Sequence, residues 1–145
     1  MSTKKLLFLS SIWPHSSHTV RAANVVFFQL LEEFSKQDNL EVGFLKVTSA
    51  DEEDVTEQEK LYLESAKRLQ VHTLPSVHIP NSSRKRSRWA SIIYPKITDF
   101  YPQYEHQELV KQAIHHYKPD ILFIPWSEWL TAVCADLLIK KFAYY

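Results

Sequence analysis

Short apolar runs alternate along this chain with segments whose apolar residues recur at helical spacing. Each run is shorter than an ordinary buried helix and therefore favours a strand. The expected strands span residues 5–10, 40–47, 71–79 and 121–125. The expected helices span residues 20–34, 56–69, 105–117 and 128–142. Because strands that alternate with helices pair in parallel, this order predicts a Rossmann-like three-layer α/β domain with a mostly parallel sheet.

Two further features concern the expected sheet. Pro75 lies within the third run and marks an edge or a bend, because proline cannot donate a backbone hydrogen bond to a neighbouring strand. The last four residues, FAYY, look like the start of another strand, so the sheet is expected to be incomplete at its C-terminus. We expect residues 1–145 to form a single domain.

The chain of 145 residues has the composition of one globular domain, with 45% hydrophobic and 23% charged residues. Lys plus Arg and Asp plus Glu both number 17, so the net charge gives no reason to expect a nucleic-acid partner. The single cysteine, Cys134, excludes an internal disulfide and is compatible with a reducing compartment. The apolar run at residues 6–13 is too short to cross a bilayer. A cytoplasmic location is therefore expected.

Several familiar chemistries are excluded by missing residues. The only glycine, Gly43, lies inside the second expected strand. A dinucleotide fingerprint, a P-loop and a hydrolase nucleophile elbow all need glycine where the backbone turns sharply or approaches a ligand. No metal site is expected either, because His15 and His18 have no Cys or acidic residue close by in their loop.

The loop after the first expected strand is the first candidate site, because parallel sheets bind ligands at the carboxyl ends of their strands. This loop, residues 11–18, leads into a helix whose N-terminus offers unpaired N–H groups to an anion or a polar sugar. In the alternative interpretation, Ser17 or Thr19 only caps the helix and Trp13 packs on the sheet. The candidate binding residues are Trp13, His15, Ser16, Ser17, His18 and Arg21.

The loop after the fourth expected strand, residues 125–129 (PWSEW), is the second candidate site. Aromatic faces stack on sugars, and a carboxylate binds hydroxyl groups or acts as a base. In the alternative interpretation, Ser127 or Glu128 only begins the last helix and the tryptophans lie in the core. The candidate residues are Trp126, Ser127 and Glu128.

Two charged segments interrupt the neutral background. Residues 51–59 carry six acidic side chains, which we expect to form a solvated loop and helix start. A basic cluster follows at Arg84, Lys85, Arg86 and Arg88. We expect this cluster to be solvated; the alternative is peripheral contact with anionic lipid at the inner face of the membrane.

Over nearly its whole length, the chain resembles the N-terminal, acceptor-side domain of GT-B glycosyltransferases, in particular the retaining family usually numbered four. The resemblance begins with the strand KKLLFLSS, the loop IWPHSSHTVRAAN and the helix VVFFQLLEEFS. It continues in ELVKQAIHHYKPDILFIPWSEWLTAVCADLL, where a helix, Lys-Pro-Asp, a short apolar strand and another helix follow one another. The resemblance rests on the order and spacing of these elements.

The resemblance implies a two-domain enzyme that transfers a sugar from a nucleotide sugar in a cleft between its domains. Residues 13–21 and 126–128 would face that cleft and bind a sugar or glycolipid acceptor. The donor-binding domain is missing from this sequence, so we expect no cofactor in this chain and no activity when it is alone; no catalytic residue is assigned. The alternative is a non-catalytic binding or interaction module, with an open sheet edge that forms a homodimer.

Overall fold

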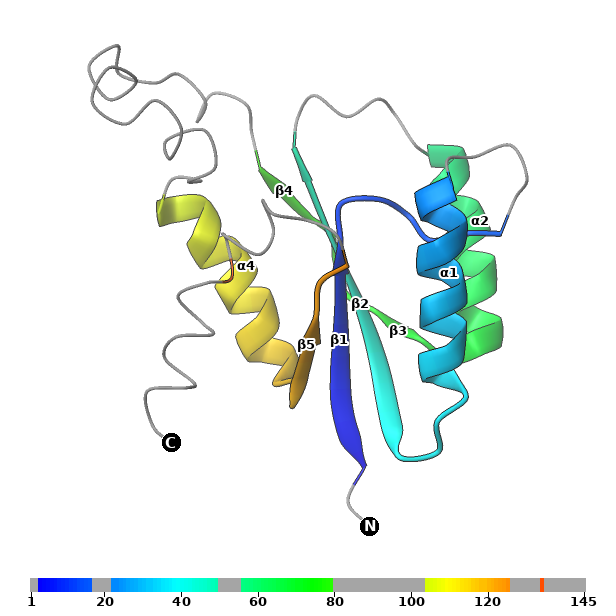
Figure 1. Cartoon of the computed structure of the whole chain (residues 1–145). Coiled ribbons are helices and arrows are strands. Elements are labelled where there is room, and N and C mark those ends of the chain that lie inside the picture. Colours follow the sequence, from blue (N-terminus) through cyan, green and yellow to red (C-terminus); the bar gives the residue numbers. More distant parts are fainter. Residues whose placement is uncertain (1–2, 17–21, 50–55, 80–103, 126–133, 135–145) are drawn as a thin grey trace.

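The computed structural model describes residues 3–16, 22–49, 56–79, 104–125 and Cys134. Within these residues, a five-stranded sheet is covered by α1 and α2 on one face and by α4 on the other (Figure 1). The strands are β1 (Lys4–Ser10), β2 (Leu40–Ser49), β3 (His72–Thr73), β4 (Val77–Ile79) and β5 (Ile121–Phe123). The helices are α1 (Ala22–Ser35), α2 (Thr56–Leu69) and α4 (Tyr104–Tyr117). This architecture confirms the predicted Rossmann-like α/β class.

The described strand pairings are all parallel, and the strand order is β3-β2-β1-β5. β1 pairs along its whole length with β2 on one side, and Leu6–Phe8 pair with β5 on the other. Two reciprocal bonds also fasten β1 to the start of β5: the Asp120 N–H donates to the Lys5 carbonyl, and the Lys5 N–H donates to Asp120 Oδ2, each at 2.8 Å. β1 is therefore held on both edges.

The third expected strand, residues 71–79, is instead two short strands, β3 and β4, on either side of Pro75, where the sequence predicts an edge or a bend. Both parts pair with β2, but the pairing shifts from Gly43↔His72 to Val47↔Val77. The difference in residue number rises from 29 (72 − 43) to 30 (77 − 47), so one extra residue is accommodated between β3 and β4. Such an irregularity fits proline, which lacks the N–H that a regular strand would donate.

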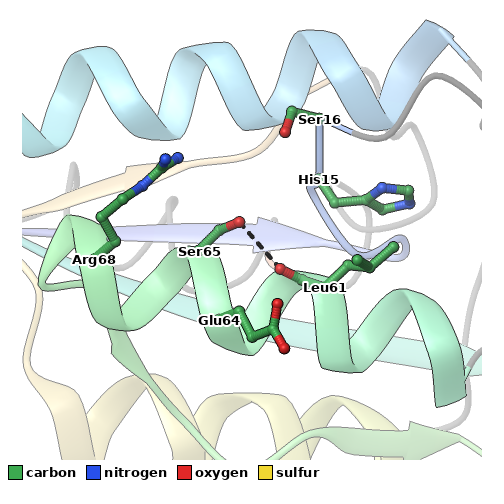
Figure 2. Close-up of a pocket in the computed structure, with 6 residues that line it drawn as sticks. All are labelled: His15, Ser16, Leu61, Glu64, Ser65 and Arg68. Atoms are coloured by element: carbon green, nitrogen blue, oxygen red, sulfur yellow. Dashed lines mark hydrogen bonds between the residues drawn. The ribbon is translucent and has the colours of Figure 1, made fainter.

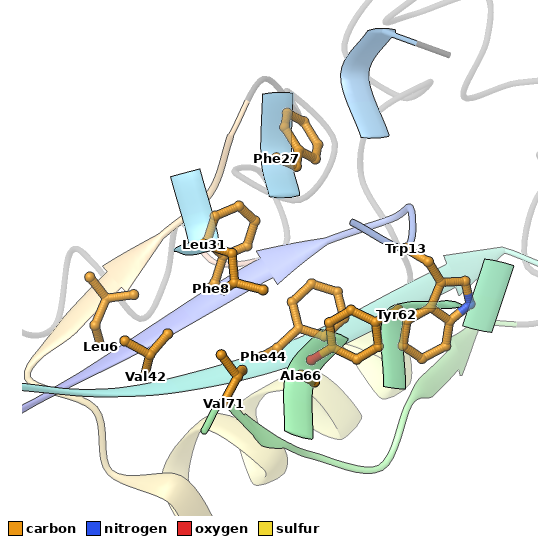
Figure 3. Close-up of a cluster of buried hydrophobic side chains, with 10 residues drawn as sticks. All are labelled: Leu6, Phe8, Trp13, Phe27, Leu31, Val42, Phe44, Tyr62, Ala66 and Val71. Carbon is orange, nitrogen blue, oxygen red and sulfur yellow. The ribbon is translucent and has the colours of Figure 1, made fainter. Parts of the chain in front are cut away.

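The hydrophobic core has two parts, one on each face of the sheet. Leu7 and Leu9 of β1 point toward α4 and join a cluster with Val110 and Tyr117. The alternate β1 side chains, Leu6 and Phe8, face α1 and α2 (Figure 3). The other members of the cluster in Figure 3 are Trp13, Phe27, Leu31, Val42, Phe44, Tyr62, Ala66 and Val71. A strand buried on both faces explains why residues 5–10 are almost continuously apolar.

The only glycine of the sequence is a packing residue in β2. A Cβ atom at Gly43 would lie 2.6 Å from Cζ of Tyr117, so the missing side chain makes room for the tyrosine ring. Tyr117 is the last residue of α4, and its hydroxyl donates a 3.4 Å hydrogen bond to the Glu41 carbonyl. Lys118, with a φ of 55°, and Pro119 then end the helix. Gly43 thus lets the end of α4 lie close against the sheet.

Two expectations about the C-terminal part fall mainly outside the described residues: the helix at residues 128–142 and the strand start at FAYY. Cys134 is the exception. Its side chain is buried in the cluster under α4, and burial raises the pKa of its thiol to about 12. The thiol is therefore a core group in the protonated form at neutral pH, as its position among apolar residues predicts.

We expect Gly43→Ala to lower the free energy of unfolding by about 1–3 kcal/mol, because the new methyl group meets the Tyr117 ring. Urea unfolding of the single variant and of the same change in a Tyr117→Leu background measures the effect. The loss should be smaller in the leucine background, where the ring is absent. An equal loss in both backgrounds would show that the tyrosine does not explain the glycine.

Candidate functional site

The chain reverses its direction of winding between β1 and β5. From β1 the chain proceeds through α1 to β2 and then through α2 to β3, with both helices on one face of the sheet. β5 lies on the opposite side of β1 and follows α4, which covers the other face. Because β1 and β5 are parallel neighbours, with Phe8 opposite Phe123, the segments that follow them leave the sheet at the same end, the carboxyl end of the strands. The place where β1 and β5 end is the topological switch point, where open parallel sheets bind their ligands. The beginnings of the two predicted loops therefore meet there.

Trp13, in the first of these loops, belongs to the core. Its side chain is 4% exposed, and its ring centroid lies 5.0 Å from that of Tyr62 and 5.8 Å from that of Phe44 (Figure 3). The Nζ atom of Lys46 lies 4.9 Å from the centroid of the Trp13 ring, at cation–π distance. The geometry corresponds to the packing alternative for Trp13 and leaves almost none of its ring for a ligand.

Asn24 fastens the loop to the first turn of α1. The side-chain amide of Asn24 donates a buried 2.8 Å hydrogen bond to the backbone carbonyl of Trp13. The backbone carbonyl of Asn24 accepts a 3.3 Å hydrogen bond from the backbone N–H of His15. The same amide also lies 3.4 Å from Oε1 of Gln58 in α2. Residues 13–15 are thus fixed against both helices, although the sequence places the loop next to α1 only.

Beyond Asn24, the loop and α2 border an open cavity of about 330 Å³ (Figure 2). His15 and Ser16 line it from the loop. From α2 it is lined by Leu61, Glu64, Ser65 and Arg68. These four positions are spaced i, i+3, i+4 and i+7, so they share one face of the helix. We call this space the His15 cavity.

The imidazole of His15 is the unusual group in this cavity. Its side chain is 1% exposed, yet neither ring nitrogen has a hydrogen-bond partner among the described residues. Burial lowers the pKa of His15 below its ordinary value of 6.5, because desolvation disfavours the charged ring. At neutral pH the ring is uncharged and offers one N–H donor and one nitrogen acceptor.

The other lining groups are both donors and acceptors. Ser65 donates its hydroxyl hydrogen to the Leu61 carbonyl at 3.0 Å, which leaves its oxygen as an acceptor. Glu64 and Arg68 are exposed, and no ion pair joins either to another side chain in the part of the chain that the structure describes. The described residues therefore bring to the cavity one carboxylate, one guanidinium, one neutral imidazole and two hydroxyl groups.

The sequence predictions account for only part of this site. His15 and Ser16 line the cavity as candidate binding residues, whereas Glu64, Ser65 and Arg68 were not singled out. The available signal was the spacing of these polar residues along one face of the predicted helix at 56–69. The remaining candidates lie outside the described residues: Ser17, His18, Arg21, Trp126, Ser127, Glu128 and the basic cluster Arg84, Lys85, Arg86 and Arg88.

Two further properties concern metal binding and membranes. No group of three or more His, Cys, Asp or Glu side chains in residues 3–16, 22–49, 56–79 and 104–125 or at Cys134 is arranged to hold a metal ion. None of the described helices is both long enough and apolar enough to cross a membrane.

Comparison with known proteins gives no assignment for this chain. No family model matches it, and neither a curated protein nor a solved structure matches it. The resemblance to glycosyltransferases therefore stays a prediction, and the functional interpretation depends on the geometry of the switch point and the His15 cavity.

We expect His15→Phe to raise the free energy of unfolding at pH 7 by on the order of 1 kcal/mol, because it replaces two unpartnered polar atoms with apolar ones. Below about pH 6.5 the wild-type protein should lose stability, since the unfolded chain binds a proton that the buried ring resists. The variant should lose less. Urea unfolding between pH 7.5 and 5 measures both effects, and a destabilised variant with unchanged pH dependence would contradict this account.

We expect Asn24→Ala to lower the free energy of unfolding by about 1–3 kcal/mol, because it leaves the buried Trp13 carbonyl without its donor. Gln58→Ala is the matched control. It removes only the 3.4 Å contact to the Asn24 amide and should cost less. Thermal unfolding of the two variants compares them, and equal losses would argue against a specific role for the bond to Trp13.

Proposed function

We propose that this chain is the acceptor-side domain of a nucleotide-sugar-dependent glycosyltransferase. The observation that carries the proposal is the adjacency of β1 and β5 at the switch point. Phe8 lies opposite Phe123 in parallel strands, so the two loops expected to bind the acceptor both begin at the carboxyl end of the sheet. Open parallel sheets bind their ligands at the carboxyl ends of their strands, at such a switch point.

The composition of the first loop fits an acceptor better than a phosphate. A close backbone approach to a phosphate generally uses glycine, and the only glycine is packed against Tyr117 inside the sheet. His15 and Ser16 instead present an imidazole and a hydroxyl group, which exchange hydrogen bonds with the hydroxyl groups of a sugar. In this proposal they contact the acceptor, and a separate domain holds the nucleotide sugar.

Such a domain contributes to catalysis by positioning. Holding an acceptor hydroxyl beside the donor sugar converts a bimolecular reaction into one between bound partners. Asn24 suits this function, because it fixes the backbone on both sides of Pro14 through the Trp13 carbonyl and the His15 N–H. We assign no nucleophile and no general base among the described residues.

Saccharide binding by the isolated chain tests the proposal. We expect neutral mono- and disaccharides to give saturation-transfer signals in NMR, whereas a nucleotide sugar such as UDP-glucose should give none at the same concentration. Sugar transfer from UDP-glucose should be undetectable with this polypeptide alone. Binding of UDP-glucose without any saccharide binding would contradict the assignment to the acceptor side.

A further inference from the structure

We propose that the acceptor carries a neutral, polyhydroxylated group and that this group binds in the His15 cavity, between the loop and α2. This inference rests on the proposed function and adds to it a location and a ligand class. The cavity is lined by His15, Ser16, Leu61, Glu64, Ser65 and Arg68, of which the last four belong to α2 (Figure 2).

The charges of the lining favour a neutral ligand. Glu64 supplies one negative charge and Arg68 one positive charge, and His15 is uncharged because its ring is desolvated. An anion bound here would meet the carboxylate, and a cation would meet the guanidinium. A neutral polyol meets neither repulsion and still forms charge-assisted hydrogen bonds to both side chains.

The hydrogen-bonding groups match hydroxyl groups in particular. Each ligand hydroxyl donates one hydrogen bond and accepts others. Arg68 only donates hydrogen bonds and Glu64 only accepts them, whereas the neutral His15 ring donates from one nitrogen and accepts at the other. Ser65 retains its lone pairs, because its hydrogen is already donated to Leu61. A ring of hydroxyl groups satisfies this mixture, which a ligand with donors or acceptors alone would leave partly unpaired.

His15 provides independent evidence for an occupant. A buried polar atom without a partner costs about 1–3 kcal/mol, so native proteins leave few of them. Both ring nitrogens of His15 are in this state among the described residues, and the ring borders the cavity. Because both nitrogens are buried, a ligand hydroxyl group supplies the missing partner only after a small movement of the ring or of its neighbours opens a nitrogen to the cavity.

The size of the cavity limits the ligand. A volume of about 330 Å³ is at the lower end of the range for small-molecule sites, which runs from about 300 to 1,000 Å³. One sugar ring or a similar polyol fits this space, so we expect the rest of a larger acceptor to extend out of it.

The test is a titration of the ¹⁵N-labelled full chain with methyl α-D-glucopyranoside, glucose 6-phosphate, glucosamine and glycine, followed by amide chemical shifts. We expect the neutral glucoside to bind at least tenfold more tightly than the other three ligands and to shift the amides of Ser16, Glu64 and Ser65. His15→Phe, which should fold at least as stably as the wild-type protein, should weaken glucoside binding at least tenfold.

Variants of the two charged residues test the charge argument. Glu64→Gln should raise the affinity for glucose 6-phosphate several-fold, because it removes the opposing carboxylate, and Arg68→Met should lower it. Lys67→Met is the matched control: Lys67 is exposed, neighbours Arg68 and does not line the cavity, so this change should leave glucoside binding unaltered.

The possible failures separate this inference from the proposed function. If the glucoside binds but shifts Ser11 and Ile124 instead, with His15→Phe unaffected, the cavity is overturned and the acceptor-side function stands. Tighter binding of glucose 6-phosphate would overturn the neutral ligand class in favour of an oxyanion, and tighter binding of glycine would overturn it in favour of a zwitterion. If no saccharide binds the wild-type chain at all, the proposed function fails as well.

Discussion

The rest of the structure depends on the burial of β1 from all sides. Its two edges pair with β2 and β5, and its two faces contribute to the two halves of the core. Leu6 to Leu9 are each at most 3% exposed. A strand held in this way has its carboxyl end at a fixed position, so the loop that follows Ser10 starts from a rigid support.

Packing of Trp13 then decides where that loop goes. Its ring lies against Phe44 and Tyr62 on the face covered by α1 and α2, and Asn24 holds its carbonyl. The next residues are thereby directed toward α2 and away from β5. Trp13, a candidate binding residue in the sequence, thus acts as the anchor that brings His15 to the face of α2 formed by Leu61, Glu64, Ser65 and Arg68.

In the proposed site, stability and ligand binding place opposite demands on His15. A phenylalanine would fill the same buried position without unpartnered nitrogens, whereas histidine keeps a donor and an acceptor beside a cavity with balanced charges. This arrangement makes sense if the cavity receives a ligand. Gly43 shows the opposite case, because its conformational freedom is not used for a ligand and its small size serves only the packing of Tyr117.

The sequence by itself determined the order of strands and helices, because burial of a strand on two faces or of a helix on one leaves a pattern in neighbouring residues. It thereby predicted the parallel sheet, an edge or a bend at Pro75 and the helix at residues 56–69, which coincides with α2. Only the tertiary structure decided that Trp13 enters the core and that His15 and Ser65, which are 50 positions apart in the sequence (65 − 15), line the same cavity. Periodicity reports which face of an element is apolar, but it does not report which loop crosses which helix; that depends on the packing of Trp13 and the hydrogen bonds of Asn24.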